Sequence, residues 1–339
     1  MNDFYKYLYY KFTAGRTKWY PILSVYYLTY RCRFRCPYCS DGSGRPYYQI
    51  DSTDPTAAET FDYLSKIREY CGYVVITGGE PLEHPGFGNV MQQLPRLEFK
   101  QVILTTNGYD VDLYLPLIAQ AVDTLVFSLD TLDHQKADSW HGIGPGSLGK
   151  ILTNIQSAHD YPGKKYKITI SSVITPWNIE DLYHVYEYAQ KKNYEFAAAP
   201  QLIGVKPHHD LLDNLIYPAY RKFYDFLINE KNQGRRVFGT RSYLTYMRDL
   251  KQFRCYPFTM LVVGPNGEIF YPCLEIGHHA GNIIASRSLH GLHEMRQKGM
   301  ALFGPQPVCD NRCQSACALG FSLFLKNPFP AIYNSIKEK

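Results

Sequence analysis

The sequence predicts an α/β fold with a parallel sheet, and two observations carry this prediction. Six short apolar runs of strand length alternate with segments of helical periodicity, and strands that alternate with helices form parallel sheets with right-handed crossovers. Cysteines and polar residues follow directly after several of these runs, at the strand ends where such folds place their chemistry. The expected strands are residues 22–28, 73–77, 101–105, 124–129, 167–174 and 194–200.

The first twenty residues are rich in aromatic and basic side chains. Apolar residues recur there at helical spacing: Phe4, Leu8, Tyr9 and Phe12. An apolar helical stripe usually packs on a core, although aromatic and basic residues also gather in helices that lie on a membrane surface. We expect residues 1–20 to form a helix on the bottom of the sheet, with a membrane-surface helix as the alternative.

The first expected strand runs into a loop that holds three cysteines, Cys32, Cys36 and Cys39. Three thiolates can bind three irons of a four-iron cluster and leave the fourth iron open, whereas an electron-transfer cluster is normally closed by four. Positive charge in the same loop favours thiolates over thiols, and it comes from Arg31, Arg33 and Arg35. A zinc site or a disulfide is the alternative, but structural zinc takes four ligands. The next cysteine, Cys71, is expected to be a buried structural thiol.

With Tyr38, this loop resembles the signature of the radical S-adenosylmethionine (radical SAM) enzymes, Cys-x3-Cys-x-aromatic-Cys. In that family a [4Fe-4S] cluster binds S-adenosylmethionine (SAM) at its open iron and cleaves it reductively to a 5'-deoxyadenosyl radical. The resemblance implies a partial (β/α)6 TIM-like barrel over residues 21–205. It also implies SAM as a partner and a reductant such as flavodoxin or ferredoxin.

Gly78, Gly79 and Glu80 follow the second expected strand. Two glycines let the backbone approach a ligand closely, and a carboxylate accepts hydrogen bonds from an ammonium group. The motif resembles the one with which the family holds the amino group of SAM. By the same resemblance, polar residues at the ends of the third and fourth strands would face the ribose or the substrate, although they are also ordinary turn residues: Thr106, Asn107, Ser128 and Asp130.

Two other features of the core are predicted to carry no site. Residues 142–149 fit Gly-x-Gly-x-x-Gly, but they follow a polar helical segment instead of a strand, so we reject a dinucleotide-binding loop. His208 and His209 lie in a polar segment, and adjacent residues seldom point to one metal, so a solvated loop is expected over a metal site. Residues 206–254 are expected to form a helical linker.

Residues 255–339 contain a second group of cysteines: Cys255, Cys273, Cys309, Cys313 and Cys317. Two of them flank a predicted hairpin over residues 259–271, and five thiols are enough for one complete cluster. The segment resembles the SPASM or twitch extension of radical SAM enzymes, a small cysteine-rich α+β domain, and so implies one auxiliary [4Fe-4S] cluster. Which four cysteines ligate it stays open, and zinc is the alternative. The apolar residues 318–334 would either close the barrel or face a membrane.

Composition limits the class of protein. Of the residues, 45% are apolar and 20% charged, the net charge is +5, and no Lys/Arg run suggests a nucleic-acid partner. Nine clustered cysteines favour metal binding in a reducing compartment. We find neither a signal peptide nor a run of about 18 apolar residues. A cytoplasmic location is expected, with peripheral membrane contact as an open alternative.

The predicted function is a radical SAM enzyme that abstracts hydrogen from its substrate. Relatives with this extension often modify peptides or proteins, so a peptide maturase is the main prediction. About 20 residues precede the barrel, too few for a separate leader-peptide domain, so a lipid, polyprenoid or small metabolite is the alternative substrate. A non-catalytic iron–sulfur or zinc scaffold is the alternative of another class.

Overall fold

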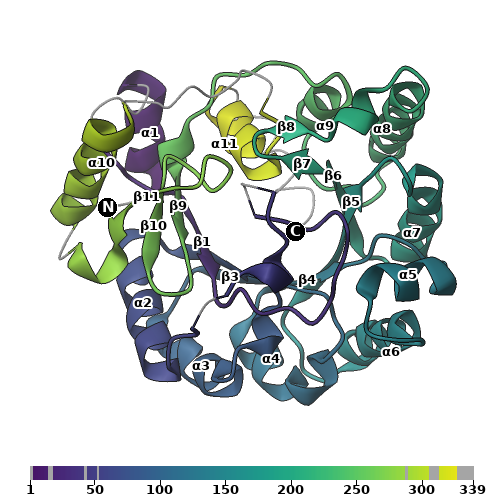
Figure 1. The fold of residues 1–339 in the computed structure, drawn as a ribbon, viewed down its shortest axis with the longest axis horizontal. Helices are drawn as coiled ribbons and strands as arrows, with labels where there is room; N and C mark the ends of the chain where they lie inside the picture. Colours follow the sequence, from purple (N-terminus) through teal and green to yellow (C-terminus); the bar gives the residue numbers. More distant parts are fainter. Residues whose placement is uncertain are drawn as a thin grey trace.

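The computed structural model describes residues 3–13, 18–41, 44–51, 53–286, 289–304 and 313–326. Most of its strands form one nine-stranded sheet, which is surrounded by helices (Figure 1). Six neighbouring strands are parallel and follow each other in chain order. They are β1 (Leu23–Tyr27), β2 (Tyr73–Thr77), β3 (Gln101–Thr106), β4 (Thr124–Ser128), β5 (Lys167–Ile174) and β6 (Glu195–Pro200). The predicted α/β fold with a partial barrel is confirmed.

Helices follow the parallel strands and cover the outer face of the sheet (Figure 1). A capping box between Thr56 and Glu59 starts the first of them, and its Leu64 and Ile67 are buried against the sheet. These helices are α2 (Ala57–Tyr70), α3 (Phe87–Gln93), α4 (Leu115–Ala121), α5 (His134–His141), α6 (Ser147–Asp160) and α7 (Ile179–Lys191). The predicted linker contains α8 (Tyr217–Asn232) and α9 (Arg241–Arg248), after a short hairpin of β7 (Leu202–Ile203) and β8 (Lys206–Pro207).

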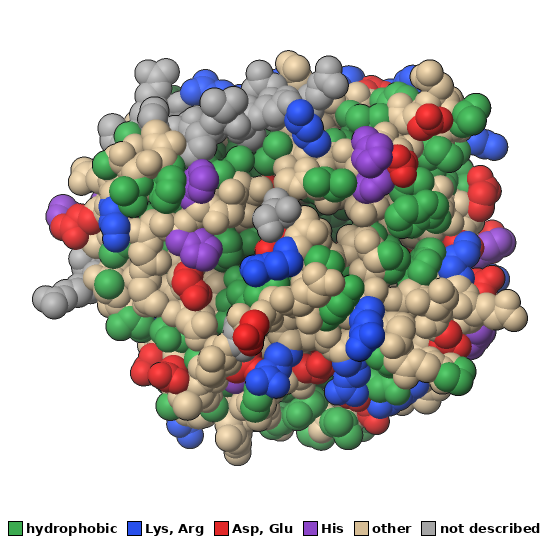
Figure 2. All heavy atoms as spheres, viewed as in Figure 1, with side chains coloured by type: hydrophobic (Ala, Val, Ile, Leu, Met, Phe, Trp, Pro, Cys, Tyr) green, Lys and Arg blue, Asp and Glu red, His purple; other side chains and the backbone are tan. Residues whose placement is uncertain are grey.

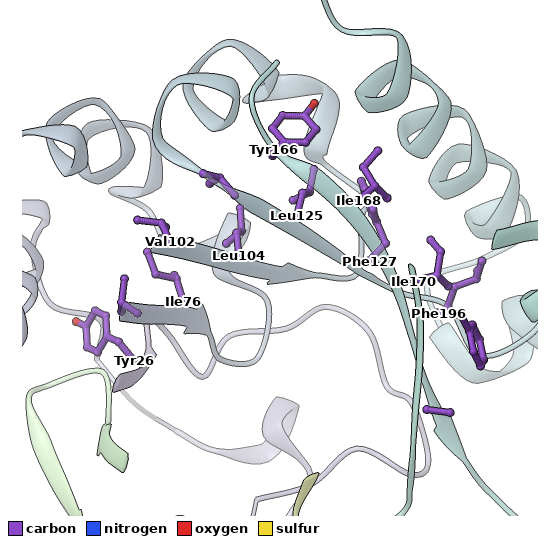
Figure 3. Packing of buried hydrophobic residues seen from close by; sticks show 14 of the residues in the cluster. Tyr26, Ile76, Val102, Leu104, Leu125, Phe127, Tyr166, Ile168, Ile170 and Phe196 are labelled. Atoms are coloured by element: carbon purple, nitrogen blue, oxygen red, sulfur yellow. The ribbon is translucent and has the colours of Figure 1, made fainter. Parts of the chain in front are cut away.

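Burial alternates along the parallel strands. Ile76, Leu104 and Phe127 are fully buried on neighbouring strands (Figure 3), whereas the intervening residues of β2, β3 and β4 are half-exposed over most of their length. Successive side chains of a strand point to opposite faces. One face of the sheet therefore packs under the helices, and the other retains access to solvent, as a barrel with a site at its mouth requires.

The predicted N-terminal helix is present as α1 (Asp3–Thr13), but a different face of it packs on the protein. Phe4 and Phe12 are exposed, while Lys6 and Tyr10 are buried. The Lys6 ammonium donates to the carbonyl oxygens of Pro21 and Tyr70, each at 2.7 Å. A buried ammonium needs such partners, and these carbonyls lie near the start of β1 and the end of α2. The helix thus packs on the bottom of the sheet, away from the cysteine loop.

The predicted C-terminal hairpin forms and extends the sheet of the barrel. Its first strand, β9 (Met260–Val263), pairs in parallel with β1, with Val262 opposite Val25. The second strand, β10 (Glu268–Tyr271), is antiparallel to β9. A further strand, β11 (His278–Asn282), was not predicted because the sequence His-His-Ala-Gly-Asn lacks alternation and β-branched residues. The C-terminal segment therefore shares the core of the barrel.

Two helices complete the described chain, α10 (Leu289–Phe303) and α11 (Ala316–Lys326). Helix α11 contacts α1 and α9, and Figure 1 shows it between the β9–β11 side of the sheet and the β6 side. Its residues Leu319 and Leu325 are buried. Within the predicted apolar segment 318–334, the described part thus closes the open side of the barrel, and the rest lies outside the described residues. No helix in the described part of the chain is long and apolar enough to cross a membrane.

Because β9 pairs with β1, damage beside β9 should destabilise the whole barrel. The buried ring of Phe258 packs edge-on against Trp19, 5.1 Å between ring centroids. We expect Phe258→Ala to lower the free energy of unfolding by about 3–5 kcal/mol in a single cooperative transition, measured by urea denaturation. The exposed Phe12 is the control, and Phe12→Ala should change little. A separate early transition in Phe258→Ala would contradict a shared core.

Candidate active site

The three N-terminal cysteines lie on the loop that follows β1. Cys32 and Cys36 are half-buried and Cys39 is exposed. The Cys39 backbone N–H donates to the Cys36 carbonyl oxygen at 3.1 Å, which forms a turn between them. The Cys39 thiol is close enough to Cys32 and to Cys36 to raise the pKa of each of them. The structure therefore brings together the trio that the spacing predicted.

Gly78 and Gly79 dock the loop after β2 against the cysteine loop. The Gly79 N–H donates to the Thr29 carbonyl at 2.8 Å, and the Glu80 N–H donates to the Arg31 carbonyl at 2.7 Å. A Cβ on Gly78 would overlap the Thr29 carbonyl oxygen, and one on Gly79 the Arg31 carbonyl oxygen. Gly78 also has φ +150°, which side chains rarely adopt. The close approach that requires glycine here is between two segments of backbone, whereas the sequence suggested an approach to a ligand.

Glu80 is buried and accepts three hydrogen bonds. Its donors are the Leu82 N–H at 3.1 Å, the Thr106 hydroxyl at 2.7 Å and the Asn107 N–H at 2.6 Å. Burial raises the pKa of Glu80 to about 7, against the lowering effect of these bonds. An ionised carboxylate has about four acceptor positions, so one position has no donor among the described residues and suits a cationic donor.

Asp130 ties the cysteine loop to the far side of the barrel. It accepts hydrogen bonds from the Tyr38 hydroxyl and from the Val173 N–H, both at 2.6 Å. Desolvation raises the pKa of Asp130 to about 6, although both bonds lower it. The Tyr38 ring also packs edge-on against Trp140, 5.5 Å between centroids. The aromatic residue of the motif thus fixes the position of the loop between Cys36 and Cys39.

Two of the three arginines of the loop, Arg31 and Arg33, are held by carboxylates that the sequence did not single out. Arg31 pairs with Asp54, which also accepts from the Thr29 hydroxyl. Arg33 pairs with Glu83 at 3.0 Å and with Asp110 at 2.7 Å. Their charge anchors the loop to its neighbours. These carboxylates could have been found from their positions in the sequence, because each stands shortly before or after an expected strand or helix.

The sequence analysis expected the arginines of the loop to favour thiolates. In the structure, however, the pKa of each of the three cysteines is raised, which favours thiols. Desolvation by the surrounding protein is the largest cause of the raised pKa of Cys32, Cys36 and Cys39, and it raises the pKa of Cys39 to about 11. Glu80 further raises the pKa of Cys32, and Asp130 that of Cys39. Thiolates are the metal ligands, so the charge that stabilises them must come with the metal.

The remaining predicted cofactor contacts lie at the same strand ends. Asn107 follows β3, its Oδ1 accepts from the Tyr109 N–H at 2.8 Å, and its Nδ2 is buried with no hydrogen-bond partner among the described residues. Ser128 is the last residue of β4 and is half-exposed. Two open polar positions, one acceptor on Glu80 and one donor on Asn107, therefore lie beside three convergent thiols. These residues fit a thiolate-bound cluster together with a ligand that carries an ammonium group and hydrogen-bond acceptors, as SAM does.

The second cysteine group is assembled beside the barrel. Cys255 and Cys273 are close enough for the Cys255 thiol to raise the pKa of Cys273. Glu275 hydrogen-bonds Cys273 and also raises the pKa of Cys317. Cys313 is buried three residues before the start of α11, and Cys309 lies outside the described residues. Cys255 thus lies near Cys273, and Glu275 lies near both Cys273 and Cys317. The sequence analysis missed this carboxylate although it stands two residues after Cys273.

A pair of tyrosines stands between the two cysteine groups. The rings of Tyr27 and Tyr47 stack at 6.1 Å between centroids and are buried. Cys317 contributes to the raised pKa of Tyr27, and Cys39 to that of Tyr47, although burial is the largest cause for both. An aromatic side chain therefore lies close to a cysteine of each group.

The sequence predicted that two further features carry no site: the glycine-rich segment after residue 141, and the pair His208 and His209. Residues 142–146 connect α5 to α6, with Gly142 ending one helix and Gly146 preceding the next, and residues 147–149 form the first turn of α6, as expected of a structural turn. His208, His209 and Asp210 do bring three ligand atoms within 4.8 Å of one another. However, His209 is 81% exposed, and His208 Nδ1 already accepts from the Asp210 N–H at 3.3 Å. The cluster is solvated, and one of its ligand atoms is in use.

Comparison with known proteins agrees with this geometry. The Radical SAM superfamily model matches residues 26–189. The chain is 28% identical over 205 residues to the GTP 3',8-cyclase of Marinobacter nauticus, covering 58% of each protein. It is 30% identical over 214 residues to the probable GTP 3',8-cyclase of Archaeoglobus fulgidus, covering 61% of this chain and 66% of that protein. The chain thus spans less than two thirds of either relative.

A solved structure shares the fold over more of the chain. The crystal structure of Streptococcus suis SuiB bound to precursor peptide SuiA superimposes with a TM-score of 0.63. The alignment covers 85% of this chain and 68% of that one, at 19% sequence identity. At this identity the likeness concerns the fold, and it includes a part of the chain beyond the barrel.

The close contact between Gly79 and the cysteine loop can be tested by adding a single methyl group to this residue. We expect Gly79→Ala to displace the loop that carries Cys32, because its Cβ would overlap the Arg31 carbonyl. Iron bound after anaerobic reconstitution should fall by about four per chain, measured with a colorimetric iron assay. Gly149→Ala on α6 is the control, since its nearest neighbour would be 3.9 Å away. Equal iron content in the two variants would contradict the docking argument.

The raised pKa of Glu80 predicts a pH dependence of SAM binding. Only the ionised carboxylate attracts the SAM ammonium, and with a pKa of about 7 its ionised fraction falls about tenfold from pH 8 to pH 6. The dissociation constant of SAM should therefore rise about tenfold over this range, as measured by equilibrium dialysis of the reconstituted protein. Glu80→Gln does not titrate and should bind SAM weakly at both pH values. A flat wild-type profile would rule out Glu80 as the ammonium partner.

Proposed function

Because the chain belongs to the radical SAM superfamily, we propose that it abstracts hydrogen from a small metabolite with a 5'-deoxyadenosyl radical. One observation carries the proposal. Three thiols lie on a loop that is docked against a buried carboxylate, and that carboxylate keeps one acceptor position open. This arrangement supports a cluster with an open iron beside a group that binds an ammonium. The scaffold alternative offers no reason for such a carboxylate.

Each side chain has a defined task in this proposal. Cys32, Cys36 and Cys39 hold the [4Fe-4S] cluster, which supplies the electron for reductive SAM cleavage when both are bound. Glu80 accepts a hydrogen bond from the SAM ammonium, and Asn107 Nδ2 donates to an acceptor of the same ligand. Tyr38 and Asp130 position the cysteine loop. The half-exposed inner face of the sheet receives the substrate near the strand ends.

The substrate proposal departs from the main prediction of the sequence. The sequence favoured a peptide or protein, with a small metabolite as the alternative. The curated relatives are named GTP 3',8-cyclase, which supports the alternative. The likeness to SuiB rests on 19% identity, so it supports the fold and leaves the substrate open. A nucleotide, with GTP as the first to test, is therefore the small metabolite that we propose.

We further propose that the C-terminal cysteines hold an auxiliary [4Fe-4S] cluster. The nearness of Cys255 to Cys273, and of Glu275 to both Cys273 and Cys317, supports these three cysteines as ligands, with either Cys313 or Cys309 as the fourth. Pairing of β9 with β1 places this group next to the strand that leads into the first cysteine loop. The two clusters would then border the same space, and the auxiliary one would take up an electron or help to bind the substrate.

Iron counts and product analysis test both sites together. Anaerobic reconstitution should give about eight irons per chain, and changing Cys32, Cys36 and Cys39 to Ala should leave about four. Reduction in the presence of SAM should yield 5'-deoxyadenosine with the wild type and none with the triple variant, measured by liquid chromatography. Addition of GTP should increase the yield of this product.

Cys71 provides a matched control for these counts. It is a buried thiol whose Sγ donates to the Ile22 carbonyl at 2.8 Å, at the opposite end of β1. Cys71→Ala should keep both clusters and form 5'-deoxyadenosine. A wild type that forms none would refute the enzyme proposal. Zinc in place of the second set of irons would refute the auxiliary cluster.

A further inference from the structure

Two buried glutamines near the mouth of the barrel have unpaired amide atoms. Gln314 is 1% exposed, and neither its Oε1 nor its Nε2 has a hydrogen-bond partner among the described residues. Gln201 is 7% exposed, and its Oε1 likewise lacks a partner. Buried polar groups are nearly always hydrogen-bonded, because leaving them unpaired costs stability. An amide with both atoms unpaired therefore indicates a missing partner.

The fold attaches both glutamines to the same small hairpin. Gln201 directly follows β6, its N–H donates to the Ile174 carbonyl at the end of β5, and its carbonyl accepts from the His208 N–H. The Gln314 N–H donates to the carbonyl of Val205, in the turn between β7 and β8. This turn and the end of β6 lie on the open side of the sheet, where the start of α11 meets them (Figure 1).

This position borders both cysteine groups. Gln314 stands next to Cys313 and three residues before Cys317, whereas Gln201 lies at the strand ends that also carry Asp130 and the first cysteine loop. Figure 2 has the same view as Figure 1 and shows this face hollowed near its centre. The unpaired amides thus lie where a substrate between the two proposed clusters would be held.

The chemistry of the amides defines the group that they would bind. A glutamine side chain offers a donor and an acceptor next to each other and carries no charge. Its natural complement is a neutral, planar edge with an adjacent acceptor and donor. Glutamine pairs in this way with adenine, and guanine presents such an edge at O6 and N1–H. A phosphate or carboxylate would be matched instead by Arg or Lys.

We propose that Gln314, assisted by Gln201, recognises the base edge of a nucleotide substrate. This inference rests on the proposed function and adds the residues that determine specificity. It also explains why the structure tolerates an unpaired amide, since binding sites commonly retain groups that cost stability until the ligand arrives. The partner of the amides is then the ligand itself.

The test combines ligand binding with stability in the full-length, reconstituted protein with SAM. The probes are GTP and inorganic triphosphate, which lacks a base. We expect Gln314→Met and Gln201→Met to weaken GTP binding about tenfold or more, with no corresponding change for triphosphate, as measured by isothermal titration calorimetry. In the ligand-free protein, Gln314→Met should raise the midpoint of thermal unfolding, because it removes an unpaired polar group.

Asn154 is the matched control for stability. It is buried like Gln314, but its amide donates to the Gly108 and Tyr109 carbonyls and to Asp112, so Asn154→Leu should lower the midpoint. If Gln314→Met lowers the midpoint of thermal unfolding as Asn154→Leu does, Gln314 makes a structural hydrogen bond, and the proposal is refuted. It also falls if the wild type does not bind GTP, if the variants bind GTP normally, or if they lose SAM instead. Absence of 5'-deoxyadenosine from the wild type would refute the enzyme proposal alone, because the binding and stability measurements do not depend on turnover.

Discussion

The close contact between two backbone segments, Thr29–Arg31 and Gly78–Gly79, is the constraint on which the site depends. It extends the parallel pairing of β1 and β2 beyond the sheet through hydrogen bonds from the second segment to the first. Cys32 and Glu80 directly follow these segments, so their separation is set by backbone bonds and not by flexible side chains. Fixed geometry of this kind is what a site needs to hold a cofactor in a reactive position.

A second constraint comes from the strand on the other side of β1. Because β9 pairs with β1 in parallel, the C-terminal segment is part of the same sheet. Strand β1 therefore lies between the two elements that carry the site, and the stacked Tyr27 and Tyr47 fill the space above it. Helix α11, which carries Cys317, then closes the open side of the barrel, and Gln314 just before it contacts the turn between β7 and β8. One strand thus organises both cysteine groups.

Sequence patterns predicted those parts of the structure that local chemistry determines. The six parallel strands follow from apolar runs, and the first cysteine trio from its spacing. Tertiary properties could not be predicted in this way. Nothing local shows that Arg33 is held by Glu83 and Asp110, that the glycines meet a backbone, or that the Gln314 amide finds no partner within the described part of the chain. The prediction of which face of α1 is buried was wrong, because tyrosine and lysine side chains can be buried when their polar ends hydrogen-bond to carbonyl groups.

The buried carboxyl groups explain why this site should be most stable when it is loaded. The pKa of Glu80 is raised to about 7 and that of Asp130 to about 6, in both cases mainly by desolvation. An acid whose pKa is raised on folding stabilises the folded state while it is protonated, and this contribution is lost as the pH rises through the folded-state pKa. Near neutral pH the empty site therefore carries desolvated negative charge beside thiols that resist ionisation. A cationic ligand at Glu80 and metal at the thiols would relieve both costs, so binding and stability are coupled in the same residues.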